Sequence, residues 1–154
     1  MNAIHFYRLE HWLYVQKIPF LPTLTRNLIF LMFNSYIPPS AKIGARTVFA
    51  YGAIGVVIHA NAVIGAHCVV GQGVTIGAAE AYISSDAKAC PTIGDNVYIG
   101  AGARILGDIR IGAHSVIASG AVVLEHIPEH SIVAGVPAKV IGQTGLDYLA
   151  IRKT

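Results

Sequence analysis

A period of six residues runs through the chain from Ile43 to Val123 and limits its fold more than any other feature. An aliphatic or aromatic anchor returns at every sixth position, and glycine often follows directly after it. The period slips by three residues after Phe49 and by a longer insertion before Ile93. The anchors are Ile43, Phe49, Ile58, Ile64, Val70, Ile76, Ile93, Ile99, Ile105, Ile111, Ile117 and Val123. Six matches neither the helical repeat of about 3.6 residues nor the two-residue alternation of a half-buried strand, so another repeating unit is needed.

A short strand followed by a tight corner accounts for this period. The anchor and a small or β-branched residue four places later would both point inward, and glycine would relieve crowding where the backbone turns. Three such sides would close a triangular coil of about 18 residues, as in the hexapeptide form of the parallel β-helix. The sequence therefore predicts an all-β solenoid of about four coils. A β-sandwich of short strands fits less well, because its loops vary in length.

The segment before this repeat is of a different kind, with apolar residues at roughly helical spacing. We expect one helix within residues 5–17 and a second within residues 22–34, because Pro19 and Pro22 would break the helix between them. The two helices would cap the open end of the solenoid. The alternative is a short α-helical segment that also touches a membrane, since apolar side chains such as Trp12 stand among basic ones.

We therefore divide the chain into a helical cap segment over residues 1–40, a solenoid over residues 41–142 and a tail over residues 143–154. Residues 78–92 interrupt the period and would leave the solenoid as an extruded loop. The most apolar stretch, residues 28–33, is much shorter than the roughly 20 residues that a membrane-spanning helix needs.

Composition narrows the classes of function. With 54% apolar and 12% charged residues, the chain is not of the disordered kind. A net charge of +3 without any basic cluster argues against a nucleic-acid partner. Cys68 and Cys90 form no CxxC pair, so neither a disulfide framework nor a zinc ribbon is supported. Without a signal peptide, these features favour a cytoplasmic protein, peripheral at the inner face of the membrane if the cap touches it.

Three runs of sequence resemble the hexapeptide-repeat acyltransferases. They cover residues 93–107 (IGDNVYIGAGARILG), 119–123 (SGAVV) and 133–142 (VAGVPAKVIG). The most similar branch holds serine acetyltransferases and the O-acetyltransferases of bacterial surface polysaccharides. The resemblance implies a left-handed β-helix that forms a homotrimer with active sites between neighbouring subunits. It also implies acetyl-CoA as cosubstrate, with no tightly bound cofactor.

Small residues on the stacked coils would form the slot for coenzyme A, which needs backbone groups for its amides and cations for its phosphates. The expected contacts are Gly100, Ala101, Gly102, Ser119 and Gly120. By motif resemblance Lys139 would meet the phosphates, although relatives often carry lysine where this chain has Glu125. Taken singly, each glycine is more simply explained as a turn residue.

His59 is the candidate general base for acetyl transfer to a hydroxyl. It stands directly after the anchor Ile58, where most repeats have glycine, and a residue that breaks a local rule is expected at functional sites. Histidine is the usual base near neutral pH. The alternative is a solvated or interface histidine at a corner. His67 is the rival, at an outward position better suited to a surface or subunit contact.

The chain departs from serine acetyltransferases at three positions of their catalytic pattern. Their Asp–His pair falls near Tyr36 and at Tyr51, and a further histidine corresponds to Cys90. We therefore expect the acceptor to be a sugar hydroxyl in surface polysaccharide or glycoconjugate biosynthesis, because the string GVVIH that ends at His59 is familiar in that branch. Serine or another small molecule is the alternative acceptor, and a non-catalytic scaffold is the remote alternative.

Three further side chains are expected to contact the acceptor. Gln72 and Asn61 should face outward near His59, and Tyr82 lies in the loop of residues 78–92. No carboxylate partner for His59 is evident in the sequence. No metal site is expected, because a metal hydrolase on this scaffold would need three convergent histidines, and only His67 lies near His59 in the repeat.

Overall fold

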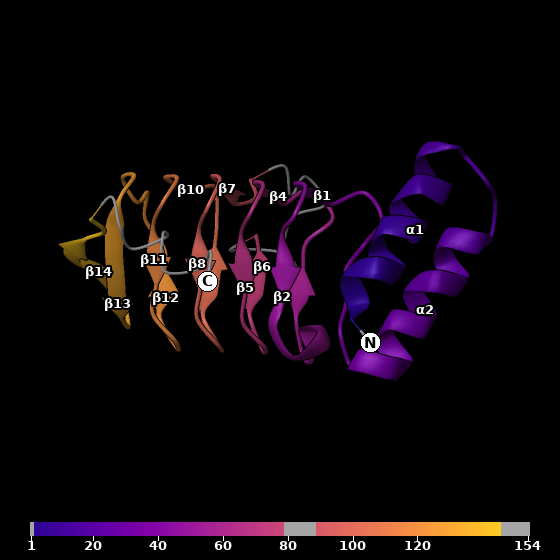
Figure 1. Cartoon of the computed structure of the whole chain (residues 1–154), viewed down its shortest axis with the longest axis horizontal. Helices are drawn as coiled ribbons and strands as arrows, with labels where there is room; N and C mark the ends of the chain where they lie inside the picture. Colours follow the sequence, from indigo (N-terminus) through magenta and orange to yellow (C-terminus); the bar gives the residue numbers. More distant parts are fainter. Residues whose placement is uncertain (1, 79–88, 146–154) are drawn as a thin grey trace.

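The computed structural model describes residues 2–78 and 89–145 and shows two helices followed by a β-helix. The helices are α1 (Ala3–Val15) and α2 (Leu21–Phe33). The strands are β1 (Lys42–Ile43), β2 (Val48–Phe49), β3 (Val57–Ile58), β4 (Val63–Ile64), β5 (Val69–Val70), β6 (Thr75–Gly77), β7 (Thr92–Ile93), β8 (Tyr98–Ile99), β9 (Arg104–Leu106), β10 (Arg110–Ile111), β11 (Val116–Ile117), β12 (Val122–Val123), β13 (Ser131–Gly135) and β14 (Ala138–Gln143). Figure 1 shows the strands stacked side by side along the long axis, with the helices at one end.

The strands form three sheets, one on each side of a triangular prism, and all their strand pairs are parallel except β13 with β14. Their orders are β1-β4-β7-β10, β14-β13-β11-β8-β5-β2 and β12-β9-β6-β3. Within the prism each strand pairs with the strand three places further along the chain, for instance Ile43 with Ile64 and Ile64 with Ile93. The sequence from β1 to β12 therefore makes four coils, and the predicted left-handed β-helix with a short helical segment is confirmed.

The core of the prism is a set of stacked anchor side chains. Ile58, Ile76 and Ile105 succeed one another along the sheet of β3, β6 and β9 and are completely buried. The residue four places after an anchor also faces inward, as Cys68 and Ala103 do. This packing is the physical basis of the period of six, because each side of a coil buries one large and one small side chain.

The first slip of the period is absorbed by a short 3-10 turn, η1 (Ala50–Ala53), between β2 and β3. Within it Tyr51 and Gly52 adopt φ values of 50° and 78°. Ser35 holds this turn, because its hydroxyl donates to the carbonyl of Ala53 and accepts from the N–H of Val56 at 3.1 Å.

The helices lie across the first coil and are bonded to it directly. The Tyr7 hydroxyl donates to the carbonyl of Ala41 at 2.6 Å, and Arg8 donates to the carbonyl of Ile43 at 2.8 Å. Stacked repeats need such a cover, because an open end exposes the apolar core. The contacts place α1 against the first coil, and no described helix is long and apolar enough to cross a membrane.

One buried group in the helices is chemically unusual. The carboxyl of Glu10 is completely buried and has no hydrogen-bond partner among the described residues. Burial raises the pKa of Glu10 to about 8, against the opposing effect of the Arg26 charge. The carboxyl is therefore neutral over much of the physiological range, which is how a buried acid without a partner avoids the cost of an unpaired charge.

Candidate active site

The three edges of the prism differ in the side chains that they carry. One edge, where the chain passes from the sheet of β3 to the sheet of β1, carries side chains with acid, base and nucleophilic chemistry. We call it the site edge, and its residues are His59, Cys90, Asp108 and His126. A second edge carries mainly small residues, and the third carries histidines on left-handed turns, without a cysteine side chain facing them among the described residues. The site edge is therefore the one to examine for a reaction.

His59 is fixed by the backbone on both sides. Its N–H donates to the carbonyl of Ile76 at 2.8 Å, and its carbonyl accepts from the N–H of Ala62 at 3.0 Å. At the equivalent position of Gly65, on another edge, a Cβ atom would lie 2.4 Å from a carboxylate oxygen of Asp95. At Gly77, one coil further along the site edge, a Cβ atom would meet nothing within 4 Å. The site edge thus has room for a side chain at this position, whereas the edge that holds Gly65 does not.

The imidazole of His59 faces the thiol of Cys90. The distance from His59 Nδ1 to Cys90 Sγ is 2.9 Å, and the backbone N–H of Asn61 also donates to Nδ1 at 3.2 Å. A backbone N–H can only donate, so Nδ1 must be the acceptor nitrogen, and the neutral ring then has its proton on Nε2. It follows that the thiol of Cys90 is the donor to Nδ1.

Cys90 is a protonated thiol in this environment. Only 6% of its surface is exposed. Burial, and secondarily the negative charge of Asp108, raise the pKa of the Cys90 thiol above its usual value. A thiol of this kind is inert until a base removes its proton. The base beside it is His59.

Two hollows open along the site edge. His59 lines the first, of about 440 Å³, together with Tyr36, Thr75 and apolar side chains of β3 and β9. Asp108, Arg110 and His126 line the second, of about 600 Å³. In the second, the N–H of Arg110 donates to Nδ1 of His126 at 3.0 Å. The first hollow is of a size that suits a small ligand next to the imidazole.

The residues expected to bind coenzyme A lie on a second edge, between the sheets of β2 and β3. Gly100, Ala101, Gly102, Ser119 and Gly120 stand there. The N–H of Gly102 donates to the carbonyl of Gln72 at 2.8 Å, and that of Gly120 to Ala101 at 2.8 Å. Gln72 therefore belongs to this edge and not to the surroundings of His59. We call this the glycine edge.

The other predicted contacts are placed as follows. Asn61 is beside His59, through its backbone N–H. Lys139 is on β14, at the end of the prism opposite the helices, where its ammonium pairs with the carboxylate of Glu125 at 3.2 Å (Figure 1). Tyr82 and most of the expected loop of residues 78–92 lie outside the described residues.

The third edge carries histidines of a different kind. His67, His114 and His130 there have left-handed backbone with φ between 56° and 59°, as do Arg46 and Asn96. We call these five residues the turn edge. The rings of His114 and His130 stack on one another at 4.9 Å. Over residues 2–78 and 89–145, no three His, Cys, Asp or Glu side chains are arranged to hold a metal ion.

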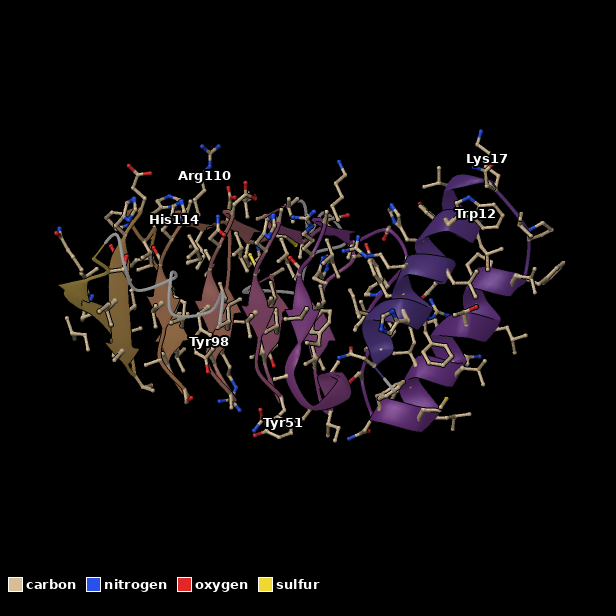
Figure 2. All side chains as sticks on the ribbon, in the orientation of Figure 1. Trp12, Lys17, Tyr51, Tyr98, Arg110 and His114 are labelled. Atoms are coloured by element: carbon tan, nitrogen blue, oxygen red, sulfur yellow. The ribbon has the colours of Figure 1, made fainter. Side chains whose placement is uncertain are left out.

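Tyr51 and Tyr36, at the positions of the Asp–His pair, do not replace that pair. Tyr51 is 77% exposed in the η1 turn. Figure 2 shows it on the opposite side of the prism from Arg110 and His114. Tyr36 lies against Arg26 of α2, with the guanidinium 5.8 Å from its ring centre. His59 therefore stays the candidate base, with its Nδ1 in contact with the thiol of Cys90.

The sequence predicts His59 as the candidate base but does not predict the side chain that His59 contacts. The partner sought in the sequence is a carboxylate, whereas the structure supplies the thiol of Cys90. The signal was present, because Cys90 occupies the position of a family histidine directly before the repeat resumes at Thr92. The insertion between them hid the proximity, since thirty-one residues separate the two side chains.

Comparison with known proteins gives a consistent result. The model of the family described as bacterial transferase hexapeptide (six repeats) matches residues 90–125. The serine acetyltransferase of Synechococcus elongatus is 38% identical over 94% of this chain and 58% of its own length. That of Mycobacterium tuberculosis is 40% identical over 94% of this chain and 61% of its own. The chain thus spans about six-tenths of the length of these curated relatives.

Solved structures agree. Serine acetyltransferase from Brucella abortus strain S19, in complex with coenzyme A, superposes with a TM-score of 0.85 at 39% identity, over 93% of this chain and 56% of that one. The Vibrio cholerae O1 enzyme gives a TM-score of 0.87 at 36% identity, over 97% of this chain and 56% of that one. Similarity therefore extends over both the helices and the β-helix.

These comparisons correct the expected function. The prediction of a sugar hydroxyl in polysaccharide or glycoconjugate biosynthesis as the acceptor is wrong, because the relatives are consistently named serine acetyltransferase. The prediction gave too much weight to the missing Asp–His pair. Loss of those side chains changes how a proton is moved, but it does not indicate what the acceptor is. The resemblance stated from the sequence is confirmed: this chain is similar to serine acetyltransferases over 94% of its length, and its residues 90–125 match the bacterial transferase hexapeptide model.

Proposed function

We propose that this protein is an acetyl-CoA-dependent O-acetyltransferase whose acceptor is a small molecule with a hydroxyl group, of the size and kind of serine. The similarity to serine acetyltransferases over most of the chain supports the reaction class, and one of these relatives is known in complex with coenzyme A. The observation that carries the proposal is His59, an imidazole with its Nδ1 kept as an acceptor beside a hollow of about 440 Å³.

The reaction needs a base at neutral pH. A hydroxyl must lose its proton as its oxygen attacks the thioester carbonyl, and a positioned base contributes about 10²–10⁴-fold to the rate. Imidazole is the side chain that changes charge in this pH range. The hydrogen bond from Asn61 makes Nδ1 the unprotonated nitrogen of the neutral ring, so Nδ1 is the atom at which His59 would take a proton.

The hollow beside His59 favours a small acceptor. The hydroxyls of Tyr36 and Thr75 are its other polar side-chain groups, and the rest of its lining is apolar or small. No acidic or basic side chain other than His59 lines it among the described residues. An amino-acid acceptor would therefore need charged partners from elsewhere, and a second copy of the chain is the source that we propose.

The placement of the two edges supports assembly into a trimer. The glycine edge and the site edge are different edges of one prism. A coenzyme that touches Gly102 and also brings its sulfur to His59 must then lie between two copies, with the glycine edge of one facing the site edge of the next. In this arrangement Lys139 would exchange its exposed pairing with Glu125 for a phosphate of the coenzyme.

Release of coenzyme A thiol tests the proposal. The full chain is incubated with acetyl-CoA and, in turn, serine and a panel of small alcohols and sugars, and binding of acetyl-CoA is measured separately by calorimetry. We expect thiol release with a small acceptor, lost in His59→Ala and kept in His67→Asn, a control whose new residue suits the left-handed backbone of that position. Absence of both binding and release would leave the non-catalytic scaffold.

A further inference from the structure

We propose that Cys90 is a nucleophile that carries the acetyl group as a thioester between acetyl-CoA and the acceptor. This inference rests on the proposed function, because it needs acetyl-CoA as the donor. It goes further, because it changes a direct transfer into two transfers through the protein. It also assigns a covalent modification to one side chain of the site edge.

The contact that carries the inference is the 2.9 Å approach of Cys90 Sγ to His59 Nδ1. Nucleophile and base within hydrogen-bond reach is the arrangement expected of a covalent catalyst. The two residues come from different coils, His59 directly after β3 and Cys90 just before β7. The fold thus brings together two side chains that are distant in the sequence, and one of them, His59, also lines the hollow of about 440 Å³.

The state of the imidazole decides which proton it can take. Asn61 donates its backbone N–H to Nδ1, so the neutral ring is protonated on Nε2 and basic only at Nδ1. That basic atom is the one in contact with the thiol. For direct attack by an acceptor, the hydroxyl would have to displace Cys90 from Nδ1. The proton that His59 is placed to take first is therefore the thiol proton.

The same hydrogen bond makes proton transfer reversible. Once Nδ1 has taken the proton, it faces the N–H of Asn61 as one donor against another. Nδ1 can then return the proton to a leaving group. The thiol is protonated at rest, so it is protected from oxidation and becomes a nucleophile only when the base acts.

The first transfer is balanced as follows. His59 Nδ1 takes the proton of Cys90, the thiolate attacks the carbonyl carbon of acetyl-CoA, and a new S–C bond forms. The bond from that carbon to the sulfur of the coenzyme breaks, and the leaving thiolate takes the proton from His59. In the second transfer Nδ1 takes the proton of the acceptor hydroxyl, the oxygen attacks acetyl-Cys90, and the released thiolate of Cys90 recovers the proton.

Cys68 provides a matched control. It is completely buried among the anchors inside the prism, and its thiol donates to the carbonyl of Gly94 at 3.2 Å. It therefore points to an acceptor that cannot remove its proton. The chain has two cysteines in all, so a cysteine-specific result can be assigned by comparing the two positions.

Two measurements on the full chain test the inference. In the first, the protein is incubated with acetyl-CoA and no acceptor. The reaction is quenched with acid, and the masses of the peptides that contain cysteine are measured by mass spectrometry. In the second, labelled coenzyme A is added, and its exchange into acetyl-CoA is followed without acceptor. We expect acetyl on Cys90 and exchange in the wild type and in Cys68→Ala. We expect neither acetylation at position 90 nor exchange in Cys90→Ala and Cys90→Ser. In His59→Ala we expect slower acetylation of Cys90.

The outcomes separate this inference from the proposed function. Transfer to an acceptor should fall more than about 100-fold in Cys90→Ala. The melting curves of Cys90→Ala and Cys90→Ser should show that both variants keep the fold. The inference is overturned if Cys90→Ala transfers acetyl at the wild-type rate, if exchange is absent while transfer proceeds, or if only Cys68 is acetylated. In each of these cases the proposed function stands. If acetyl-CoA does not bind, the proposed function fails, and this inference fails with it.

Discussion

The site edge and the turn edge of the prism are formed by the same stacked coils, and both carry histidines. On the turn edge the imidazoles of His67 and His114 stand on left-handed turn residues and repeat along the stack. On the site edge His59 stands directly after an anchor and faces a thiol from the next coil. A histidine in a repeat protein is therefore a candidate for catalysis because of the groups that its ring nitrogens contact, and not because of its residue type alone.

The origin of this difference is the space between neighbouring coils. On the turn edge the backbone of the next coil comes so close that a Cβ atom at Gly65 would lie 2.6 Å from the carbonyl carbon of Gly94. On the site edge the position of Gly77 is open. Among the described residues, no atom lies within 4 Å of a Cβ atom placed at Gly77. Side chains that the other edges exclude can therefore gather on the site edge.

The largest expected effect is on activity and separates the two edges directly. His59→Ala should lower acetyl transfer by about 10²–10⁴-fold, because the base for both transfers is lost. His67→Asn and His114→Asn should stay within about twofold, since both are turn residues and asparagine tolerates their backbone. Initial rates of thiol release measure both. Equal losses of activity in the variants of the two edges would contradict the assignment of the reaction to the site edge.

Glu10 lies outside both edges and is a useful contrast to Cys90. Its buried carboxyl has no hydrogen-bond partner among the described residues, whereas the Cys90 thiol contacts an imidazole. The native pKa of Glu10 is about 8 and the ordinary value is 4.5, so the folded state holds its proton more tightly than the unfolded state. Stability from this group is complete below pH 4.5 and is lost as the pH rises to about 8. Glu10→Gln should therefore be more stable than the wild type at pH 9 by a few kcal/mol, and equal to it at pH 4.

Urea denaturation from pH 4 to pH 9 measures this effect. Glu129→Gln is the control, because Glu129 is exposed on the prism. Parallel stability curves for Glu10→Gln and the wild type would show that the carboxyl is not the group that titrates.

The space at the two edges can be probed by placing a methyl group on each. Gly65→Ala on the turn edge should destabilise the fold by about 1–3 kcal/mol, because the new Cβ atom collides with backbone of the next coil. Gly77→Ala on the site edge should change stability by less than about 0.5 kcal/mol. Thermal unfolding of the two variants gives the difference. A large loss for Gly77→Ala would mean that the site edge is as crowded as the other.

The smallest expected effect concerns the reactivity of Cys90. The charge of Asp108 contributes to its raised pKa, after burial, so Asp108→Asn should lower that pKa modestly. Alkylation of Cys90 by iodoacetamide should then reach its half-maximal rate at a lower pH. Asp95→Asn is the matched change on the turn edge, where the carboxylate accepts from the N–H of Ala66, and it should leave the profile unmoved. Identical shifts in both variants would contradict the local role of Asp108.

Much of the fold could be predicted because each coil is specified locally. The period of six gives the anchors, and burial of Ile58, Ile76 and Ile105 follows from it. His59 could be singled out because it breaks the glycine rule of its position. The period shows which residues face outward, and this alone predicts Gln72 near His59. The edge on which Gln72 lies follows only when the six-residue repeats are counted in groups of three, which puts Gln72 on the glycine edge.

The rest of the site depends on contacts that the period does not encode. Cys90 reaches His59 across an insertion, and no spacing rule gives the path of an insertion. The acceptor depends on side chains that line a hollow, and, in the trimer we propose, on those of a second copy. A motif of this fold therefore indicates the scaffold and the donor more firmly than it indicates the acceptor.

A crystal structure with coenzyme A bound shows directly whether acetyl transfer takes place at the His59–Cys90 pair. We expect the sulfur of the coenzyme on the site edge, within about 3.5 Å of Cys90 Sγ or the His59 ring, the separation at which groups react. A sulfur placed on the turn edge, beside His67 or His114, would contradict the account.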